Sequence, residues 1–343
     1  MKPKRTISEL RQDLVSDEWV VIAPGRARRI SQRFRKKSKI KPPPTSTCPF
    51  EDPQKTGHGA PFLALDKKGK EIVWQLGRQY PWFLQVLPNK FPIVGKGDCS
   101  VAHRQGPHSW LEGAGFHEIV IYREHSKQPA YFTGREVELM LRGYQERHRA
   151  LSQEDCVEYV LIYHNHGLEA GASIYHPHSQ IIALPVIPPD VGRSIKGSEE
   201  YYKKHRRCVH CDMIRWERKA KKRLVYENKE MTVFCPFASK VSFEVRIFPK
   251  KHEHSFADID DTQREYLADA FGKVLHKIAK GLGEPSYNFF IHTAPTRPEQ
   301  FKHYHWHIEI LPRTSIWAGV ELGTGIEVVA VAPEKAAAYL RKS

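Results

Sequence analysis

The chain has 343 residues, of which 40% are hydrophobic and 27% charged, so it can build a core and is not disordered throughout. Its 54 lysines and arginines outnumber its 39 acidic residues, and the net charge of +15 indicates an anionic partner: nucleic acid, a membrane surface or phosphorylated small molecules. The sequence has neither an apolar leader nor a membrane-length apolar run, and six cysteines do not make a disulfide scaffold, so we expect a cytoplasmic protein.

The predicted elements of the first half are strands and one long helix. Strands are expected at residues 18–23, 118–122, 157–163 and 180–186, and a helix at residues 134–152. A linker or loop is expected at residues 31–47, where basic residues and prolines are concentrated. Residues 187–199 then lead into the second half, so the expected domains are 1–190 and 191–343.

The second half repeats this order. Strands are expected at residues 243–248, 287–292 and 305–311, with a helix at residues 261–281 between the first two. His125 precedes His176 by 51 residues, and His252 precedes His305 by 53. The sequence therefore indicates two copies of one strand–helix–strand unit, which predicts an α+β fold with a mostly antiparallel sheet and flanking helices.

Two sets of residues have the types and spacing of metal ligands. In the second half, Cys208 and Cys211 form a C-x-x-C pair, to which the repeat adds His252 and His305; together they predict a closed, structural Zn²⁺ site, with ordinary or redox-active cysteines as the alternative. In the first half, a glutamate stands where the second cysteine would fall. We expect there either a looser zinc site or a metal-free remnant held by hydrogen bonds. The first-half set is Cys48, Glu51, His125 and His176.

The motif HPHSQ at residues 176–180 carries the predicted chemistry. Because the repeat assigns only His176 to metal, His178 is free, and a neutral imidazole nitrogen can attack a phosphorus and leave again. Gln180 lies on the same strand face as His178, and the glycine-bearing loop that ends at Ser173 can aim backbone N–H groups at a phosphate. The sequence therefore predicts transient phosphoryl or nucleotidyl capture on His178.

The second half carries a related histidine pair without the same surroundings. After His307 comes Glu309, an anionic carboxylate that would repel a phosphate. The preceding segment TAPTRPEQFKHY contains two prolines, which lack an N–H group. We therefore expect a decayed second site, kept for its metal ligand and for packing.

Together these motifs resemble those of the galactose-1-phosphate uridylyltransferase family in the histidine-triad superfamily. The similarity covers nearly the whole chain and includes ELRQDLVSDEWVVIAPGRARR, PNKFP, GFHEIVIYREHS, NHGLEAGASIYHPHSQ, YNFFIHTAP and GVELGTGI. The resemblance implies two tandem histidine-triad-like halves and a homodimer with active sites across its interface. It also implies a two-step transfer, in which the histidine matching His178 takes a uridylyl group from UDP-glucose and passes it to galactose 1-phosphate.

The resemblance further assigns the residues that contact the nucleotide sugar and the sugar phosphate. Gln180 matches the glutamine that holds the phosphoryl oxygens, and Ser173 and Asn165 match phosphate contacts. Asn89 matches a nucleoside contact. The remaining matched residues are Arg26 and Arg29, on the nucleotide's phosphates, and Glu321, in the segment that reads the hexose.

The chain also departs from the family pattern. Lys90 stands where well-known members have an aspartate near the ribose, which leaves uridine and adenosine nucleotides both open. The iron site of some members matches only His292 and the stretch at residues 307–309, so no iron is expected. The segment 315–327 also resembles a plant branch that acts as an ADP-glucose phosphorylase. An ADP- or UDP-sugar phosphorylase is therefore the alternative function.

A zinc-stabilised nucleic-acid-binding protein is the alternative from another class. Such a protein needs aromatic residues among its basic ones, and the basic run at residues 26–41 contains only Phe34. We therefore expect neither nucleic acid nor a membrane as a partner.

Overall fold

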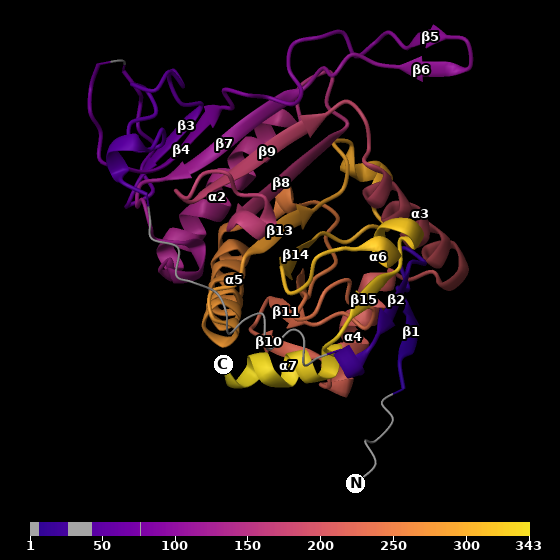
Figure 1. Ribbon diagram of the computed structural model, residues 1–343. Coiled ribbons are helices and arrows are strands. Elements are labelled where there is room, and N and C mark those ends of the chain that lie inside the picture. Colours follow the sequence, from indigo (N-terminus) through magenta and orange to yellow (C-terminus); the bar gives the residue numbers. More distant parts are fainter. Residues whose placement is uncertain (1–6, 27–42, 76) are drawn as a thin grey trace.

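The duplication expected from the sequence is visible in the large sheet of the computed structural model, which describes residues 7–26, 43–75 and 77–343 (Figure 1). Among these residues, ten strands form one sheet in which every neighbouring pair is antiparallel. From edge to edge, the strands are β10 (Leu224–Glu227), β11 (Met231–Phe234), β12 (Val245–Pro249), β14 (His307–Pro312), β13 (Tyr287–His292), β8 (Tyr159–His166), β9 (His178–Leu184), β7 (Phe116–Tyr122), β4 (Trp82–Pro88) and β3 (Leu63–Asp66).

The strand order is symmetrical about the pair β13–β8. Each strand of the first half has a second-half counterpart at the same distance from the centre, so β9 corresponds to β14 and β7 to β12. At the centre, Asn288 pairs with Asn165 and Phe289 with His164. The two copies therefore join edge to edge into one α+β sheet, as the fold-class prediction required, and the prediction of a mostly antiparallel sheet is confirmed.

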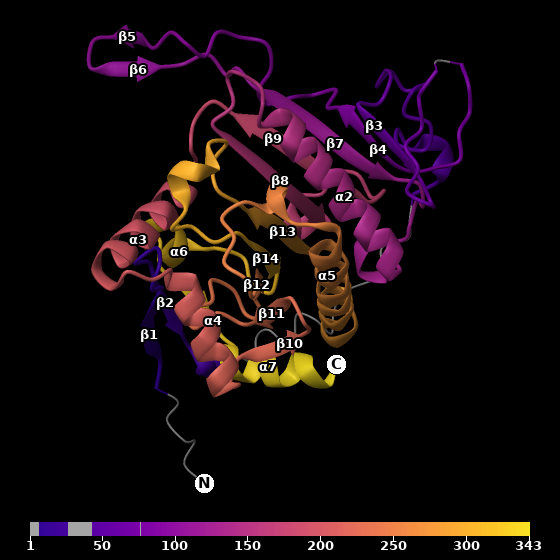
Figure 2. The ribbon, with the colours of Figure 1, turned by 180° about the vertical axis from the view of Figure 1, so that it is seen from behind.

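Two long helices cover one face of this sheet, where they lie side by side (Figure 2). They are α2 (Gly134–Leu151) and α5 (Asp261–Leu282), close to the predicted residues 134–152 and 261–281. Each begins with a reciprocal capping box, at Thr133 and at Asp260. The buried stripes of both helices and the inward side chains of the central strands make the main hydrophobic core.

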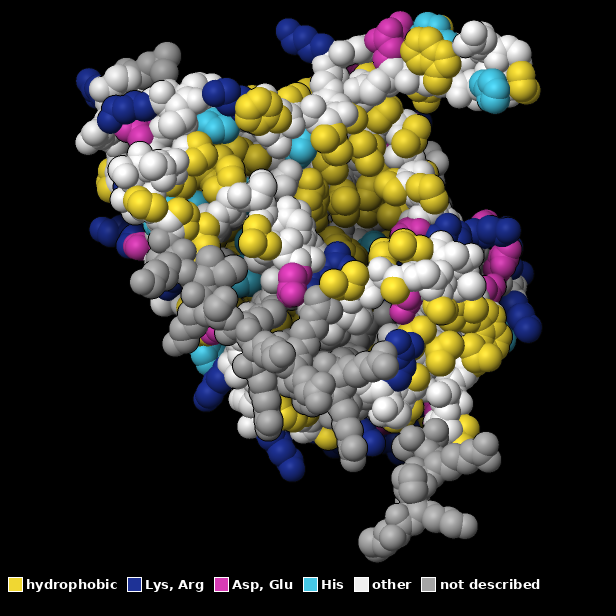
Figure 3. All heavy atoms as spheres, in the orientation of Figure 1, with side chains coloured by type: hydrophobic (Ala, Val, Ile, Leu, Met, Phe, Trp, Pro, Cys, Tyr) yellow, Lys and Arg dark blue, Asp and Glu magenta, His cyan; other side chains and the backbone are white. Residues whose placement is uncertain are grey.

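Among the described residues, those that cover the opposite face lie at its two ends. Side chains from the segments on either side of β3, among them Phe50 and Trp74, pack over β4 and β7. The helices α3 (Pro189–His205) and α4 (Val209–Ala220) lie over the second half. Between them, the face of the central strands is hollowed and lined by hydrophobic side chains (Figure 3). The other elements are the small sheet β1 (Glu9–Gln12), β2 (Trp19–Ile22) and β15 (Glu327–Val329), the hairpin β5 (His103–Gln105) and β6 (His108–Trp110), and the helices α6 (Gly319–Thr324) and α7 (Pro333–Lys342).

Several expected boundaries shift in the structure. The connection expected at residues 187–199 is mostly the helix α3, and the expected domain boundary at residue 190 falls inside this helix. β9 begins at His178, two residues before the predicted start, so His178 lies on the strand itself. β14 begins at His307, two residues after the predicted start, and His307 lies on the strand as expected. Most of the linker expected at residues 31–47 lies outside the described residues, and its described end carries a short 3₁₀ helix at Thr45–Thr47.

Two further findings concern the expected environment of the chain. Cys99 and Cys156 form a disulfide, which the sequence analysis did not anticipate, so the expectation of a reducing compartment stays a prediction. Among the described residues, none of the helices is both long and apolar enough to cross a membrane.

The packing of α3 against the turn between β1 and β2 depends on one glycine. A Cβ atom at Gly197 would lie 1.7 Å from the backbone oxygen of Val15, whereas a Cβ atom at Gly192 on the same helix would meet nothing within 4 Å. We expect Gly197→Ala to lower the free energy of unfolding by about 1–3 kcal/mol, because backbone must move. The matched control Gly192→Ala should raise it by up to about 1 kcal/mol. Chemical denaturation measures both, and equal effects of the two variants would contradict this packing.

Candidate active site and metal centres

His178 is held so that one defined ring nitrogen is available for chemistry. It is the first residue of β9, it is 7% exposed, and the ring of Phe50 packs edge-on against it at 5.1 Å between centroids. Its Nδ1 lies 2.9 Å from the backbone oxygen of His176. A carbonyl can only accept, so Nδ1 carries the hydrogen. Burial lowers the pKa of His178, so the ring is neutral near pH 7 and the lone pair lies on Nε2.

Gln180 lies beside His178 on the open face of the sheet. Its Oε1 accepts a hydrogen bond from the hydroxyl of Tyr163 at 2.9 Å and lies 2.8 Å from Nε2 of His117. Asn89, the predicted nucleoside contact, lies against the ring of His117. Sequence reasoning missed both His117 and Tyr163. His117 directly precedes the strand predicted at residues 118–122, and the observed strand begins earlier, at Phe116. The signal that could have found His117 is its place two residues before Ile119, because alternate residues of a strand share a face.

Asn165 is a second amide on this face, at the end of β8. Its Oδ1 accepts from Nδ2 of Asn288 at 2.7 Å, which leaves its own NH₂ group as a donor. The Asn288 amide cannot exchange the places of its oxygen and nitrogen. Its Oδ1 accepts from Nε of Arg313 at 2.6 Å, and its Nδ2 donates to the backbone oxygen of Ala170 at 2.8 Å. The orientation of Asn165 is therefore set from the second half of the chain.

The loop between β8 and β9 brings backbone close to this site. Gly167 and Gly171 have φ angles of +82° and +88°, which residues with side chains rarely adopt, and a Cβ atom at Gly167 would lie 2.3 Å from Oγ of Ser286. Ser173, which follows the loop, is exposed. The loop thus passes beside Asn165, whose Nδ2 would lie 3.8 Å from a Cβ atom at Gly171.

Two other predicted substrate residues lie together in a separate pocket. Arg26 and Glu321 line a cavity of about 520 Å³ with residues 314–316 and 318–320, Val328 and Ala330, and the cavity lining includes neither His178 nor Gln180. Arg29 lies outside the described residues. The structure therefore brings together one group of predicted site residues around His178 and a second group around Arg26.

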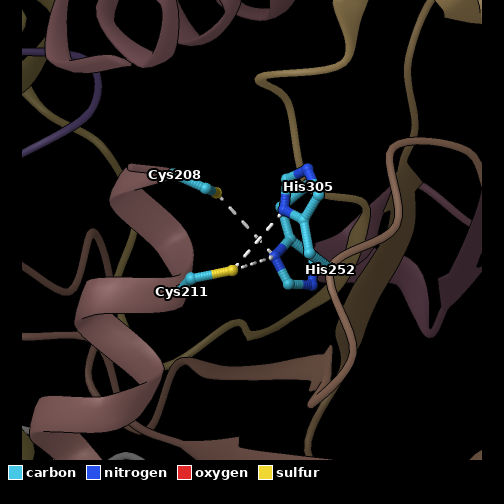
Figure 4. Close-up of side chains that lie close together, drawn as sticks. All are labelled: Cys208, Cys211, His252 and His305. Atoms are coloured by element: carbon cyan, nitrogen blue, oxygen red, sulfur yellow. Dashed lines mark hydrogen bonds between the residues drawn. The ribbon is translucent and has the colours of Figure 1, made fainter. Parts of the chain in front are cut away.

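The four candidate metal ligands of the second half converge on one point (Figure 4). Cys208 and Cys211 lie at the start of α4. His252, in the segment after β12, and His305, in the segment before β14, face them. Their ligand atoms all lie within 4.8 Å of one another, and Sγ of Cys211 is 3.5 Å from Nδ1 of each histidine. Hydrogen bonding, chiefly from Cys211, lowers the pKa of the Cys208 thiol. Two thiols and two imidazoles suit a tetrahedral metal ion.

The first-half set converges in the same way. Oε1 of Glu51 and Nδ1 of His125 are buried and 2.8 Å apart, yet neither makes a hydrogen bond within the described part of the chain. Sγ of Cys48 lies 3.5 Å from Nδ1 of His176, and all four ligand atoms lie within 4.8 Å of one another. Because Nε2 of His125 is bonded to a backbone oxygen, its Nδ1 and the Glu51 carboxylate offer two lone pairs to one point, which fits a cation.

The same kind of hydrogen bond, from the ring to a backbone oxygen, orients the four histidines of the two sets. In each ring, Nε2 lies within hydrogen-bonding distance of a backbone oxygen, so Nε2 carries the hydrogen and Nδ1 offers its lone pair to the cluster. The equivalent pair, His176 and His305, is bonded in this way to Tyr122 and Pro249 at 2.6 and 3.1 Å. The other pair, His125 and His252, is bonded to Pro43 and Lys302 at 3.1 and 2.7 Å.

A further group of possible ligands already contains a cation. His292, His307 and Glu309 have ligand atoms within 4.8 Å of one another. However, Nε of the buried Arg246 lies 2.9 Å from Glu309 and 3.0 Å from Glu244. Although burial acts to raise the pKa of Glu309, the Arg246 charge holds it well below its ordinary value. The guanidinium therefore does for these carboxylates what a metal ion would do.

Comparison with known proteins finds family models for both halves of the chain and relatives that match nearly all of it. The family model described as galactose-1-phosphate uridyl transferase, N-terminal domain, matches residues 2–188, and the HIT domain matches residues 217–315. The ADP-glucose phosphorylase of Arabidopsis thaliana is 32% identical over 97% of this chain and 92% of its own length. The galactose-1-phosphate uridylyltransferase of Thermotoga maritima is 27% identical over 98% of both chains. The crystal structure of an Arabidopsis thaliana ADP-glucose phosphorylase with bound ADP-glucose matches 98% of this chain and 99% of its own, with a TM-score of 0.79 and 29% identity.

The second-half metal set is expected to stabilise the fold rather than to take part in chemistry, because protein atoms supply all four ligands. Cys208→Ser should therefore remove about one metal ion per chain and lower the melting temperature, while the folded fraction keeps its activity. Elemental analysis and calorimetry measure these effects. As a control, Cys235→Ser changes a buried cysteine outside both sets and should leave the metal content unchanged. A chelator that leaves the melting temperature of the wild-type protein unchanged would contradict the assignment.

Proposed function

This chain belongs to the galactose-1-phosphate uridyl transferase family, and from that premise we propose that it is a nucleotidyltransferase that works through a covalent intermediate on His178. The observation that carries the proposal is the hydrogen bond from Nδ1 of His178 to the backbone oxygen of His176, which leaves Nε2 as a nucleophile. The open face beside it offers the amide groups of Gln180 and Asn165 as donors.

In the first step, Nε2 attacks the α-phosphorus of a nucleotide sugar. A bond forms between Nε2 and phosphorus, and the bond from phosphorus to the bridging oxygen breaks, so that a hexose 1-phosphate leaves. The ring becomes positively charged because Nδ1 keeps its hydrogen, and the carbonyl of His176 stabilises this charge. In the second step, a phosphate oxygen of the acceptor attacks the same phosphorus and returns His178 to its neutral form.

The substrates that we propose are UDP-glucose and galactose 1-phosphate, which exchange a uridylyl group. Family membership and the likeness to the Thermotoga maritima enzyme support this reaction. A second candidate is the phosphorolysis of ADP-glucose with inorganic phosphate as the acceptor. The greater identity to the Arabidopsis thaliana ADP-glucose phosphorylase and the TM-score of 0.79 to its structure favour this candidate. Both reactions share the intermediate on His178 and differ in the nucleotide and the acceptor.

We propose zinc as the metal of both ligand sets. Thiolate and imidazole suit zinc, and the first-half set, with one glutamate, would hold it less firmly. Zinc there would fix the ring of His176, whose backbone oxygen accepts the hydrogen bond from His178. A metal ion held by this set would therefore orient His178 through the main chain. The contact between Arg246 and Glu309 supports the expectation that no iron binds in the second half.

We also propose that the active enzyme is a homodimer. The pocket lined by Arg26 and Glu321 contains two of the predicted substrate contacts, yet its lining shares no residue with the surroundings of His178 and Gln180. If the corresponding pocket of a second copy met the hollow face over β8 and β9, one substrate could touch both groups.

The role of His178 predicts a large difference between two equivalent histidines. His178→Ala should reduce transfer by at least about 10⁴-fold while the protein stays folded and metal-loaded, because no nucleophile remains. His307→Ala, the counterpart on β14, should reduce transfer by about tenfold or less, since only packing is lost. Steady-state turnover, with metal content as the folding control, measures both. Comparable losses in the two variants would remove His178 from its proposed role.

The identity of the nucleotide is expected to appear as a mass change. When the protein is mixed with UDP-glucose or ADP-glucose without an acceptor, the true substrate should leave its nucleotidyl group on the protein, because the second step cannot proceed. Intact mass spectrometry distinguishes uridylyl from adenylyl by mass. A uridylyl adduct supports the exchange with galactose 1-phosphate, and an adenylyl adduct supports phosphorolysis. No adduct from either sugar would contradict the covalent route.

A further inference from the structure

The side chains around Gln180 decide which end of its amide faces the substrate. An amide has an oxygen that accepts and an NH₂ group that donates, and only the NH₂ group can stabilise phosphoryl oxygens. Its Oε1 is engaged by Tyr163 at 2.9 Å and by His117 at 2.8 Å. These partners come from the strands on either side of β9: Tyr163 is paired with Gln180, and His117 lies two residues from Ile119, which is also paired with Gln180.

The two partners differ in what they permit. The hydroxyl of Tyr163 can donate or accept, so it accommodates either end of the amide. His117 has no such choice, because the backbone N–H of Ile93 donates to its Nδ1 at 3.2 Å. Burial lowers the pKa of His117, although the hydrogen bond with Gln180 acts in the opposite direction. The neutral ring therefore carries its single hydrogen on Nε2, and a flipped Gln180 would place an N–H against an N–H.

The segment that follows β4 packs against His117. Oδ1 of Asn89 accepts from the backbone N–H of Phe91 at 3.0 Å, which turns the Asn89 amide nitrogen toward the ring of His117. That nitrogen lies 3.2 Å from Nε2 and 3.4 Å from Nδ1. The backbone N–H of Asn89 also donates to the backbone oxygen of His117 at 2.8 Å. The predicted nucleoside contact and the phosphate-binding glutamine are thus joined through one ring.

We infer that His117 is a positioning residue for nucleotidyl transfer: its Nε2–H holds Oε1 of Gln180, so that the Gln180 NH₂ group faces the phosphoryl oxygens. The inference rests on the proposed function, since it assigns a role in that reaction. His117 itself does not touch the reacting phosphorus. It keeps the Gln180 amide, whose oxygen and NH₂ group could otherwise exchange places, in the one orientation that stabilises the transition state.

The test measures the rate at which a nucleotide sugar labels His178, by rapid quenching and intact mass spectrometry with the nucleotide sugar that labels the wild-type protein. His117→Ala should slow labelling by roughly 10- to 100-fold at saturation, no more than Gln180→Ala, and should change the half-saturating concentration by less than about threefold. His117→Gln, which can place an N–H near the position of Nε2, should recover most of the rate. Tyr163→Phe should cost less than His117→Ala, because a hydroxyl imposes no orientation.

A double mutant separates positioning from general damage to the fold. In a Gln180→Ala background, His117→Ala should slow labelling by no more than about twofold, because the group that it positions is gone. Melting temperature and metal content report whether each variant is folded. The inference would be overturned if the labelling rate of the double mutant fell by the product of the two single-mutant factors, or if His117→Ala were labelled at the wild-type rate. Either result would leave the covalent route intact. If the wild-type protein is labelled by no nucleotide sugar, the proposed function itself is wrong, and the inference with it.

Discussion

A neutral imidazole carries a single N–H, and the backbone oxygen that accepts it decides what each functional histidine of this chain can do. Where Nε2–H is bonded to a carbonyl, Nδ1 is left for a metal; where Nδ1–H is bonded to a carbonyl, Nε2 is left for chemistry. His176 and His178, two residues apart, show the two cases side by side, and the backbone oxygen of His176 is the acceptor for His178. The proposed metal ligand and the proposed nucleophile are therefore parts of one hydrogen-bonded chain. The same alternation recurs in the second half at His305 and His307.

The second half shows that this alternation alone does not make an active site. His307 has the same bond to the preceding histidine as His178 has, at 3.2 Å, but its surroundings carry charge instead of amides. Glu309 replaces the glutamine, and Arg246 fills the space beside it. A buried carboxylate paired with a guanidinium stays ionised, and an ionised carboxylate cannot donate a hydrogen bond to a phosphate. Duplication thus left one copy with donors for an anion and the other with an internal ion pair.

Sequence alone predicts the parts of this protein that depend on local spacing. The strand and helix periodicity, the repeat and the ligand types were sufficient to predict the antiparallel sheet and the two sets that the structure brings together. The orientation of Gln180 and Asn165 was not predictable, because it depends on partners in other strands: His117 on β7, and Asn288 from the other half of the sheet. The pairing of Cys99 with Cys156 was missed for a similar reason, since 57 residues separate them and no motif links them. The separation of Arg26 from His178 is also a property of the three-dimensional fold, not of either motif.

The central claim is that Nε2 of His178 forms the covalent bond to the nucleotide. The most direct measurement is peptide mapping by tandem mass spectrometry, after the protein is mixed with the nucleotide sugar in the absence of an acceptor and digested under conditions that preserve phosphorus–nitrogen bonds. The account predicts one nucleotidyl group per chain, on the peptide that contains residues 176–180 and on His178 within it. A nucleotidyl group on His307 would contradict the account, because the charged surroundings of that histidine would then not prevent the reaction. A nucleotidyl group on His176 would also contradict it, because the tautomer set by the backbone would then not determine which nitrogen reacts.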